Sequence, residues 1–162
     1  MIGKKLARCV QYFRYSKDIV LNLGWNEDVI HSEIDAAFAV YPDMKSHSGL
    51  TFTLGKGAII SSSRKQKVNS RSSTEAEFNA MDDMISKIIR VKKFLAEQGF
   101  KVMLNIIYQD NTSTMRLQNN GKLSSGKRTR RFDIKLFYIT DLISRDEVEV
   151  RYCPTDEMIG DY

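Results

Sequence analysis

Four acidic residues stand in places that usually favour apolar or neutral side chains. Asp35 lies inside an alternating strand pattern, Glu77 at the start of an apolar helix face, and Asp110 directly after an apolar strand. Asp161 lies in a short helical pattern near the end of the sequence. Carboxylates beside apolar residues need a positive partner, because they lose hydration and raise one another's pKa. Acids that converge from strand ends and helix starts can hold two Mg²⁺ ions about 4 Å apart, an arrangement that hydrolyses phosphodiesters.

Each acid also has a structural interpretation. Glu77 follows Thr74 at the spacing of a capping box, and Asp110 with the next residue could form a turn or an N-cap. Asp35 could pair with a nearby lysine or arginine, and Asp161 could be a frayed surface residue. The metal-site hypothesis therefore rests on the order of the four acids and on the elements that carry them.

The elements that must position these acids are predicted from hydrophobic periodicity. Alternation predicts five strands, at about 29–37, 50–54, 58–61, 102–108 and 147–152. Helical spacing predicts helices at about 1–16, 74–98, 112–118 and 132–143, and the start of a last one at 156–162. Residues 19–23 are interpreted as a short strand or an extended connector. This order predicts a mixed α/β sheet with helices packed on it.

Composition sets broad limits on the function. The chain has 162 residues, of which 42% are hydrophobic and 28% charged, as is typical of one compact soluble domain. No membrane-length apolar run and no secretory signal are seen, so we expect an intracellular protein, cytoplasmic or nuclear, that does not bind a membrane. Cys9 and Cys153 are interpreted as free thiols, not as zinc ligands.

The net charge of +5 is concentrated in two basic clusters. The first contains Arg64, Lys65, Lys67 and Arg71, and the second contains Lys122, Lys127, Arg128, Arg130 and Arg131. Such clusters suit a polyanion such as nucleic acid. A solvated surface without a ligand is the alternative interpretation.

Several segments together resemble a known family. They are Asp35-Ala36-Ala37-Phe38-Ala39, Ser72-Ser73-Thr74-Glu75-Ala76-Glu77, Tyr108-Gln109-Asp110-Asn111 and Tyr152-Cys153-Pro154-Thr155. In this order they resemble the ribonuclease H domain of Ty1/copia-type retrotransposon Pol polyproteins. Residues 29–162 correspond to that domain with its last helix truncated, and residues 1–28 resemble the junction with the reverse transcriptase.

The resemblance implies a fold, an activity and a set of site residues. The fold is ribonuclease H-like, with a five-stranded mixed sheet flanked by helices. The activity is metal-dependent endonucleolytic hydrolysis of the RNA strand of RNA–DNA hybrids during reverse transcription. Two Mg²⁺ ions, for which Mn²⁺ can substitute, would be held by Asp35, Glu77, Asp110 and Asp161. The partners implied are the hybrid and a reverse transcriptase domain. Contacts to the hybrid are expected from Ser63, Arg64, Lys65, Gln66, Asn111, Lys127, Arg128 and Arg130.

The chain also departs from the family pattern. The sequence stops one residue after Asp161, Gly160 stands where the family usually has alanine, and Arg131-Phe132-Asp133 replaces a segment that usually begins with histidine. Two alternatives to an active hydrolase follow. One is a catalytically weak or inactive nucleic-acid-binding remnant of a polyprotein, which the truncation favours. The other is an interaction domain without nucleic acid, which the three retained core acids disfavour.

Overall fold

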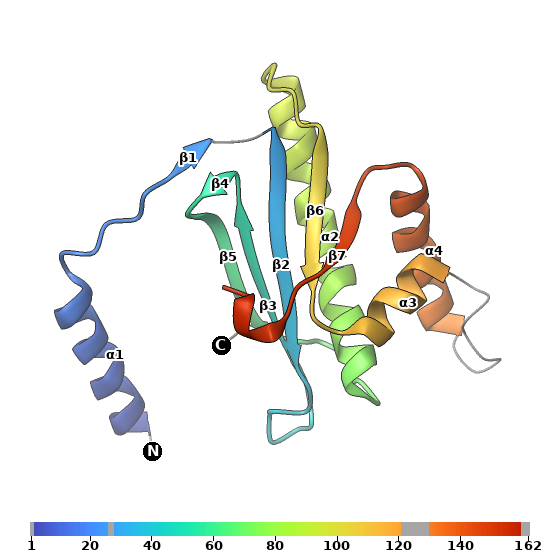
Figure 1. The fold of residues 1–162 in the computed structure, drawn as a ribbon. Coiled ribbons are helices and arrows are strands. Elements are labelled where there is room, and N and C mark those ends of the chain that lie inside the picture. Colours follow the sequence, from blue (N-terminus) through green and yellow to red (C-terminus); the bar gives the residue numbers. More distant parts are fainter. Residues whose placement is uncertain (1, 26–27, 121–129, 160–162) are drawn as a thin grey trace.

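The computed structural model describes residues 2–25, 28–120 and 130–159 (Figure 1). Its helices are α1 (Ile2–Ser16), α2 (Ser73–Glu97), α3 (Thr112–Asn120), α4 (Arg130–Ser144) and a 3₁₀ helix η2 (Thr155–Glu157). Its strands are β1 (Gly24–Trp25), β2 (Val29–Ala37), β3 (His47–Thr53), β4 (Gly55–Lys56), β5 (Ala58–Lys65), β6 (Leu104–Gln109) and β7 (Glu149–Tyr152).

The main sheet has five strands in the order β5-β3-β2-β6-β7. β3 runs antiparallel to both of its neighbours, β2 and β5, whereas β6 runs parallel to both β2 and β7. The predicted mixed five-stranded sheet is therefore confirmed. A separate two-stranded sheet joins β1 to β4. Helix α2 packs across β2 and β3 on one face of the main sheet (Figure 1).

The hydrophobic core lies between α2 and this sheet face. On β2, Ile30 and Ile34 have no exposed surface, and they alternate with half-buried residues on the opposite face. On α2, Met81, Met84 and Ile88 are equally buried and recur at helical spacing. Each such side chain stabilises the fold by about 1.5–3 kcal/mol relative to exposure. This packing holds the start of α2 against β2, where Asp35 and Glu77 stand.

The cap of α2 differs from the sequence-based prediction. Ser72 is the N-cap, and its hydroxyl accepts a hydrogen bond of 3.1 Å from the backbone N–H of Glu75. The Glu75 carboxylate in turn accepts a 2.8 Å bond from the N–H of Arg71. The predicted capping box of Thr74 and Glu77 is thus wrong, because the N-cap lies two residues earlier, at Ser72, and the glutamate at the cap is Glu75. Glu77 is left available for another role.

Several other elements differ from their predicted bounds. Strands β3 and β5 extend to His47 and Lys65, through residues that the sequence analysis left outside the predicted strands. Residues 19–23 form no strand, and the short β1 follows them instead. In the described part of the C-terminal segment, the predicted last helix is only the 3₁₀ turn η2.

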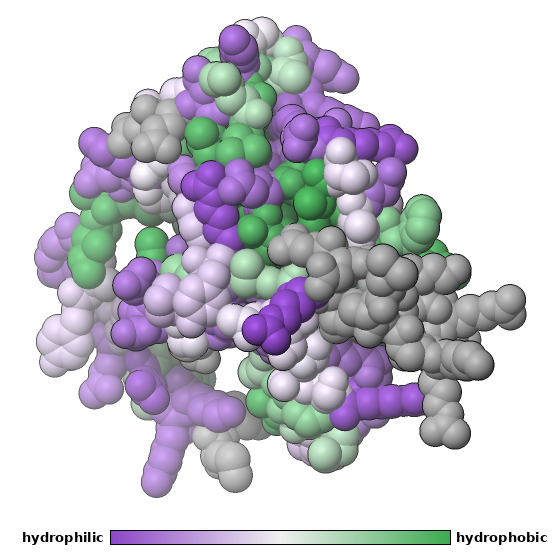
Figure 2. Space-filling model, turned by 45° about the vertical axis from the view of Figure 1, so that its right-hand side comes forward, coloured by the Kyte–Doolittle hydropathy of each residue, from purple (hydrophilic) through white to green (hydrophobic). Residues whose placement is uncertain are grey.

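Helix α1 stands apart from the sheet in Figure 1, and the apolar residues Leu6, Val10 and Phe13 on it are exposed. On the face of the molecule in Figure 2, apolar residues form several separate areas between hydrophilic ones. Within the described ranges, none of the helices has both the length and the apolar character needed to cross a membrane.

Candidate active site

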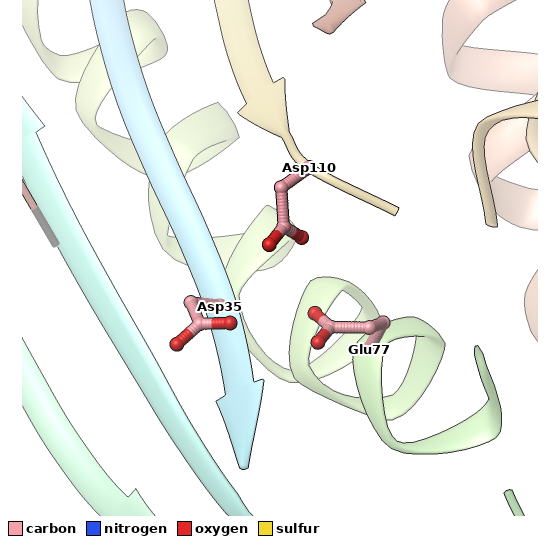
Figure 3. Close-up of side chains that lie close together, drawn as sticks. All are labelled: Asp35, Glu77 and Asp110. Atoms are coloured by element: carbon pink, nitrogen blue, oxygen red, sulfur yellow. The ribbon is translucent and has the colours of Figure 1, made fainter. Parts of the chain in front are cut away.

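Three of the four predicted acids meet at one end of the sheet. Asp35 comes from β2, Glu77 from the second turn of α2, and Asp110 directly follows β6. One carboxylate oxygen from each lies within 4.8 Å of the other two. Figure 3 shows the three side chains pointing toward one another from these separate elements. Residues that lie 42 and 33 positions apart in sequence therefore form one acidic cluster, which we define as Asp35, Glu77 and Asp110.

Glu77 is the buried member of the acidic cluster, with 5% of its surface exposed. Its Oε1 accepts a 3.2 Å hydrogen bond from the backbone N–H of Ala36, and its Oε2 accepts a 3.0 Å bond from Nε2 of Gln109. The pKa of Glu77 is raised to about 8, chiefly by burial and to a smaller extent by the charges of Asp35 and Asp110, while the hydrogen bonds from Gln109 and Ala36 oppose the shift. A cation at the cluster would offset both the cost of burying the charged Glu77 carboxylate and its repulsion from the two aspartates.

Asp35 and Asp110 are only partly buried, so their carboxylates remain accessible to a ligand. Asp110 Oδ2 accepts a 2.8 Å hydrogen bond from the hydroxyl of Thr155, in the 3₁₀ turn η2. This bond ties the C-terminal segment to the acidic cluster and orients the Asp110 carboxylate.

The chemistry of the donor set suits a hard divalent cation. All three side chains offer oxygen, which Mg²⁺ and Mn²⁺ prefer. Their mutual distances would allow one ion to contact several of them, and the pKa of Glu77 is raised by its burial and by the two neighbouring carboxylates, both of which a cation would offset. The residues therefore fit the metal that the family resemblance implies, with Asp35, Glu77 and Asp110 as its holders.

The remaining predicted site residues fall into several groups. Asp161, Lys127 and Arg128 lie outside the described residues, as does the side chain of Arg130, although its backbone begins α4. Their predicted contacts to metal or nucleic acid are therefore neither supported nor opposed by the structure.

The basic residues of β5 do not share one face. By strand register, Ser63 lies across Gly49 from Asp35 on the same side of the sheet, and Lys65 lies in the next row. Arg64 faces the other side, where its guanidinium donates to the backbone carbonyl of Asp83 in α2 at 3.1 Å. Ser63 and Lys65 therefore lie on the sheet face that carries Asp35, where the Ser63 hydroxyl contacts His47 Nε2 and the Lys65 ammonium pairs with Asp43, each at 2.7 Å, whereas Arg64 is directed toward α2.

Two predicted nucleic-acid contacts have other roles in the structure. Gln66 has 2% of its surface exposed, and its amide nitrogen donates to Ser48 Oγ at 2.9 Å and to the carbonyl of Ala76 at 2.8 Å. Its expected contact to a sugar or base is therefore corrected to a buried structural one, because both amide protons are already used. Asn111 caps α3, since its Oδ1 accepts hydrogen bonds from the N–H groups of the following helix start.

Two residues beside the acidic cluster were missed in the sequence analysis. Gln109 binds Glu77, and Thr155 binds Asp110. Both lie in segments that carry the family resemblance, and Gln109 directly precedes an acid. The sequence signal for Gln109 was its position as the last residue of an apolar strand, since a polar side chain there points into the interior and needs a buried partner.

Comparisons with known proteins find similarity to retrotransposon polyproteins. It is 29% identical over 153 residues to the retrovirus-related Pol polyprotein from transposon TNT 1-94 of Nicotiana tabacum, a match that covers 94% of this chain. It is 28% identical over 130 residues to the transposon Ty1-NL2 Gag-Pol polyprotein of Saccharomyces cerevisiae, covering 78% of this chain. The chain spans only 11% and 7% of the lengths of these two relatives. No family model matches it.

Solved structures agree with the fold. LC11-RNase H1, isolated from compost, superimposes with a TM-score of 0.60 at 14% identity, covering 80% of this chain and 87% of that one. The same enzyme in complex with an RNA/DNA hybrid gives 0.56 at 15% identity, covering 82% and 91%. These values establish a ribonuclease H-like fold. The chain is a distant homologue of the Ty1/copia Pol polyproteins, and the region of Pol that it matches is consistent with ribonuclease H.

Proposed function

We propose that this chain is a metal-dependent ribonuclease that hydrolyses the RNA strand of RNA–DNA hybrids. The observation that carries the proposal is the acidic cluster, in which three carboxylates from three elements lie within 4.8 Å of one another. Homology to retrotransposon Pol polyproteins supports it, because the ribonuclease H domain that the chain resembles is expected to cleave such hybrids during reverse transcription. The fold supports it too, because a structural neighbour is a ribonuclease H1 bound to an RNA/DNA hybrid.

The residues of the chain divide the work of such a site. Asp35 and Asp110 present partly exposed carboxylates toward the side from which a phosphate can approach. Glu77 stays buried, and the N–H of Ala36 and the amide of Gln109 fix its two oxygens. Mg²⁺ held by these three groups would neutralise charge on the scissile phosphate and lower the pKa of an attacking water. Three clustered carboxyl groups cannot by themselves attract an anionic phosphate, so a cation would be needed for binding as well as for chemistry.

Recognition of the hybrid is proposed to use the sheet face beside Asp35. Ser63 and Lys65 lie on this face. To contact a bound strand, the Lys65 ammonium would exchange its ion pair with Asp43, and the Ser63 hydroxyl its contact with His47, for a phosphate or a sugar. The basic segment with Lys127, Arg128 and Arg130 is proposed to add phosphate contacts, which are largely independent of sequence. Replacing Lys65 with methionine should weaken hybrid binding and reduce the salt dependence by about one phosphate contact.

The test is cleavage of a hybrid with a labelled RNA strand by the purified chain. We expect cutting of the RNA strand with Mg²⁺ or Mn²⁺, none with EDTA, and none of either strand in duplex DNA. Asp110→Asn should abolish the activity, because it removes one of the three converging charges. Asp146→Asn is the matched control: it makes the same chemical change at a residue with φ of 55°, a conformation that asparagine tolerates.

Two results would overturn the proposal. The first is a folded chain that binds the hybrid but does not cut it with either metal, which would leave a nucleic-acid-binding remnant. The second is equal activity in the wild type and Asp110→Asn, which would show that the activity comes from a contaminating nuclease or from other residues.

A further inference from the structure

The side-chain amide of Gln109, at the end of β6, is buried beside Glu77. Gln109 has no exposed surface, and its Nε2 donates to Glu77 Oε2 at 3.0 Å. Its Oε1 is also buried and has no hydrogen-bond partner among the described residues. A side chain chosen to fill the core would not leave a buried carbonyl oxygen unpaired, because that is destabilising by about 1–3 kcal/mol. The amide is therefore explained by the hydrogen bond that it gives to Glu77.

A second buried amide holds the backbone from which Glu77 projects. Gln66 follows β5 directly, and it donates to the carbonyl of Ala76, the residue before Glu77, and to Ser48 Oγ in β3. The register places Ser48 opposite Ala36, whose N–H binds the other oxygen of Glu77. Gln66 thus connects the first turn of α2 to β3, the neighbour of the strand that carries Asp35 and Ala36.

The Gln66 amide is itself held in place by a chain of polar contacts. Its Oε1 accepts a 3.1 Å bond from the hydroxyl of Ser70, and Ser70 accepts a 3.1 Å bond from Nδ2 of Asn79. Lys135 of α4 completes the chain by donating to Asn79 Oδ1 at 3.1 Å. All hydrogen-bonding groups of the Gln66 side chain are therefore used, and its orientation is fixed.

We propose that Gln66 and Gln109, which we call the glutamine clamp, are positioning residues that hold Glu77 in the geometry needed to bind a divalent cation. Gln109 fixes the carboxylate, and Gln66 fixes the helix turn that carries it. Neither residue touches the metal or substrate. The clamp rests on the proposed function, because it supports the same acidic cluster. Removing a partner that orients a metal ligand typically weakens metal binding 10- to 100-fold.

The test compares metal affinity with stability in variants of similar shape. Gln109→Met and Gln66→Met each remove an amide and keep most of the side-chain volume. Asn105→Leu is the matched control, because Asn105 is also on β6, also fully buried, and also donates one amide bond, to the carbonyl of Glu147 at 2.9 Å. Its Oδ1 likewise has no partner among the described residues, yet it lies four positions before Gln109. Mn²⁺ binding is measured by electron paramagnetic resonance, and stability by urea unfolding in EDTA.

We expect Mn²⁺ to bind at least about tenfold more weakly to both methionine variants, while Asn105→Leu keeps wild-type affinity whatever stability it loses. The Mg²⁺ concentration needed for half-maximal hybrid cleavage should rise in the same proportion. Should Gln66→Met fail to fold, Ser48→Ala removes one of its acceptors with a smaller disturbance and should still weaken Mn²⁺ binding. Unchanged affinity in the folded Gln109→Met variant overturns the clamp, as does an equal loss in Asn105→Leu.

The same measurements separate the clamp from the proposed function. A wild-type chain that binds Mn²⁺ but cuts no hybrid contradicts the hydrolase proposal, and the variant affinities still decide the clamp. A wild-type chain that cuts hybrid while both methionine variants bind Mn²⁺ normally contradicts only the clamp. A wild-type chain that binds no Mn²⁺ at millimolar concentration contradicts both.

Discussion

Replacing Glu77 with glutamine should stabilise the metal-free chain at neutral and alkaline pH. The folded-state pKa of Glu77 is raised to about 8 from an ordinary value of 4.5, chiefly by burial. The folded chain therefore holds the Glu77 proton more tightly than the unfolded chain does. The stabilisation from this proton is fully present below about pH 4.5, and it is lost as the pH rises toward 8. Glutamine has nearly the same shape and does not titrate, so the variant escapes this loss.

The size of the effect follows from the shift in pKa. Each unit of pKa difference corresponds to about 1.4 kcal/mol, so the loss in the wild type reaches about 3 kcal/mol at pH 7 and about 5 kcal/mol above pH 8. Hydrogen bonding should change little. The new amide carbonyl can accept the N–H of Ala36, and rotation of the Gln109 amide would let its unpaired Oε1 accept from the new NH₂ group.

The assay is urea unfolding of the wild type and Glu77→Gln in EDTA at several pH values between 5 and 8.5. The informative quantity is the difference in unfolding free energy between the two proteins as a function of pH, because constant differences in packing cancel from its slope. Glu77→Gln should gain on the wild type by about 1.4 kcal/mol per pH unit below pH 8. With Mg²⁺ at 100 times its dissociation constant, the wild type should recover about 2.7 kcal/mol and the variant much less.

Parallel pH profiles for the two proteins in EDTA would refute this reasoning. They would mean that Glu77 titrates near its ordinary pKa in the folded state and that water or a nearby cation already compensates its charge. Equal stabilisation of both proteins by Mg²⁺ would refute the assignment of Glu77 as a metal holder, whatever the pH profiles showed.

Three further predictions concern the scaffold. Ser72→Ala should lower the unfolding free energy, measured in urea, by about 1 kcal/mol, because Ser72 caps α2. Thr74→Ala should lower it by clearly less, and a larger loss in Thr74→Ala than in Ser72→Ala would indicate that Thr74 is the cap instead. Ile88→Ala should lower the same quantity by about 2–5 kcal/mol, because Ile88 is fully buried between α2 and the sheet, and a loss under 1 kcal/mol would argue against that packing. Gly57→Ala should free β1 from β4, because Gly57 has φ of +63° and an added Cβ would lie 2.3 Å from the carbonyl oxygen of Asn22. Faster hydrogen exchange at β1 is the expected readout, and unchanged exchange would contradict it.

The sequence was sufficient to identify the three acids of the cluster but not the residues that hydrogen-bond to them, Gln109 and Thr155. Asp35 stands out because strands are depleted in Asp, and Asp110 stands out through its place directly after an apolar strand within the order of the acids. Glu77 was harder to assign, because Ser72 with Glu75 and Thr74 with Glu77 have the same capping-box spacing. Only the packing of α2 on β2 shows which glutamate caps the helix and which one turns toward Asp35.

Gln66 shows why local sequence misleads at such a position. It stands between two lysines after a serine-rich stretch, a context that predicts an exposed polar loop. Its partners Ser48, Ser70 and Ala76 come from a strand, a loop and a helix, and no short window contains all of them. The extent of β5 was underestimated for a related reason. An edge strand can expose polar side chains on alternate positions, and it then lacks the hydrophobic run by which strands are predicted.

Strand direction explains why the acids and the glutamine clamp occupy one end of the sheet. β5 and β2 are each antiparallel to β3, so they point the same way, and β6 runs parallel to β2. The C-terminal ends of these three strands therefore lie at the same end of the sheet. Helix α2 connects β5 to β6. It therefore begins at that end of the sheet and runs back along the sheet to the start of β6. Asp35 near the end of β2, Asp110 after β6 and Glu77 early in α2 are brought together by this path alone.

The same path places the two glutamines. Gln66 directly follows β5 and Gln109 ends β6, so both amides stand at the edge where α2 begins. A glutamine at either strand end can reach inward to the first turns of α2 without a change in the sheet. The topology thus sets where a buried carboxylate can be held. The amide of Gln109 and the N–H of Ala36 offset part of the burial that favours the neutral form of Glu77, and a bound cation would offset the rest.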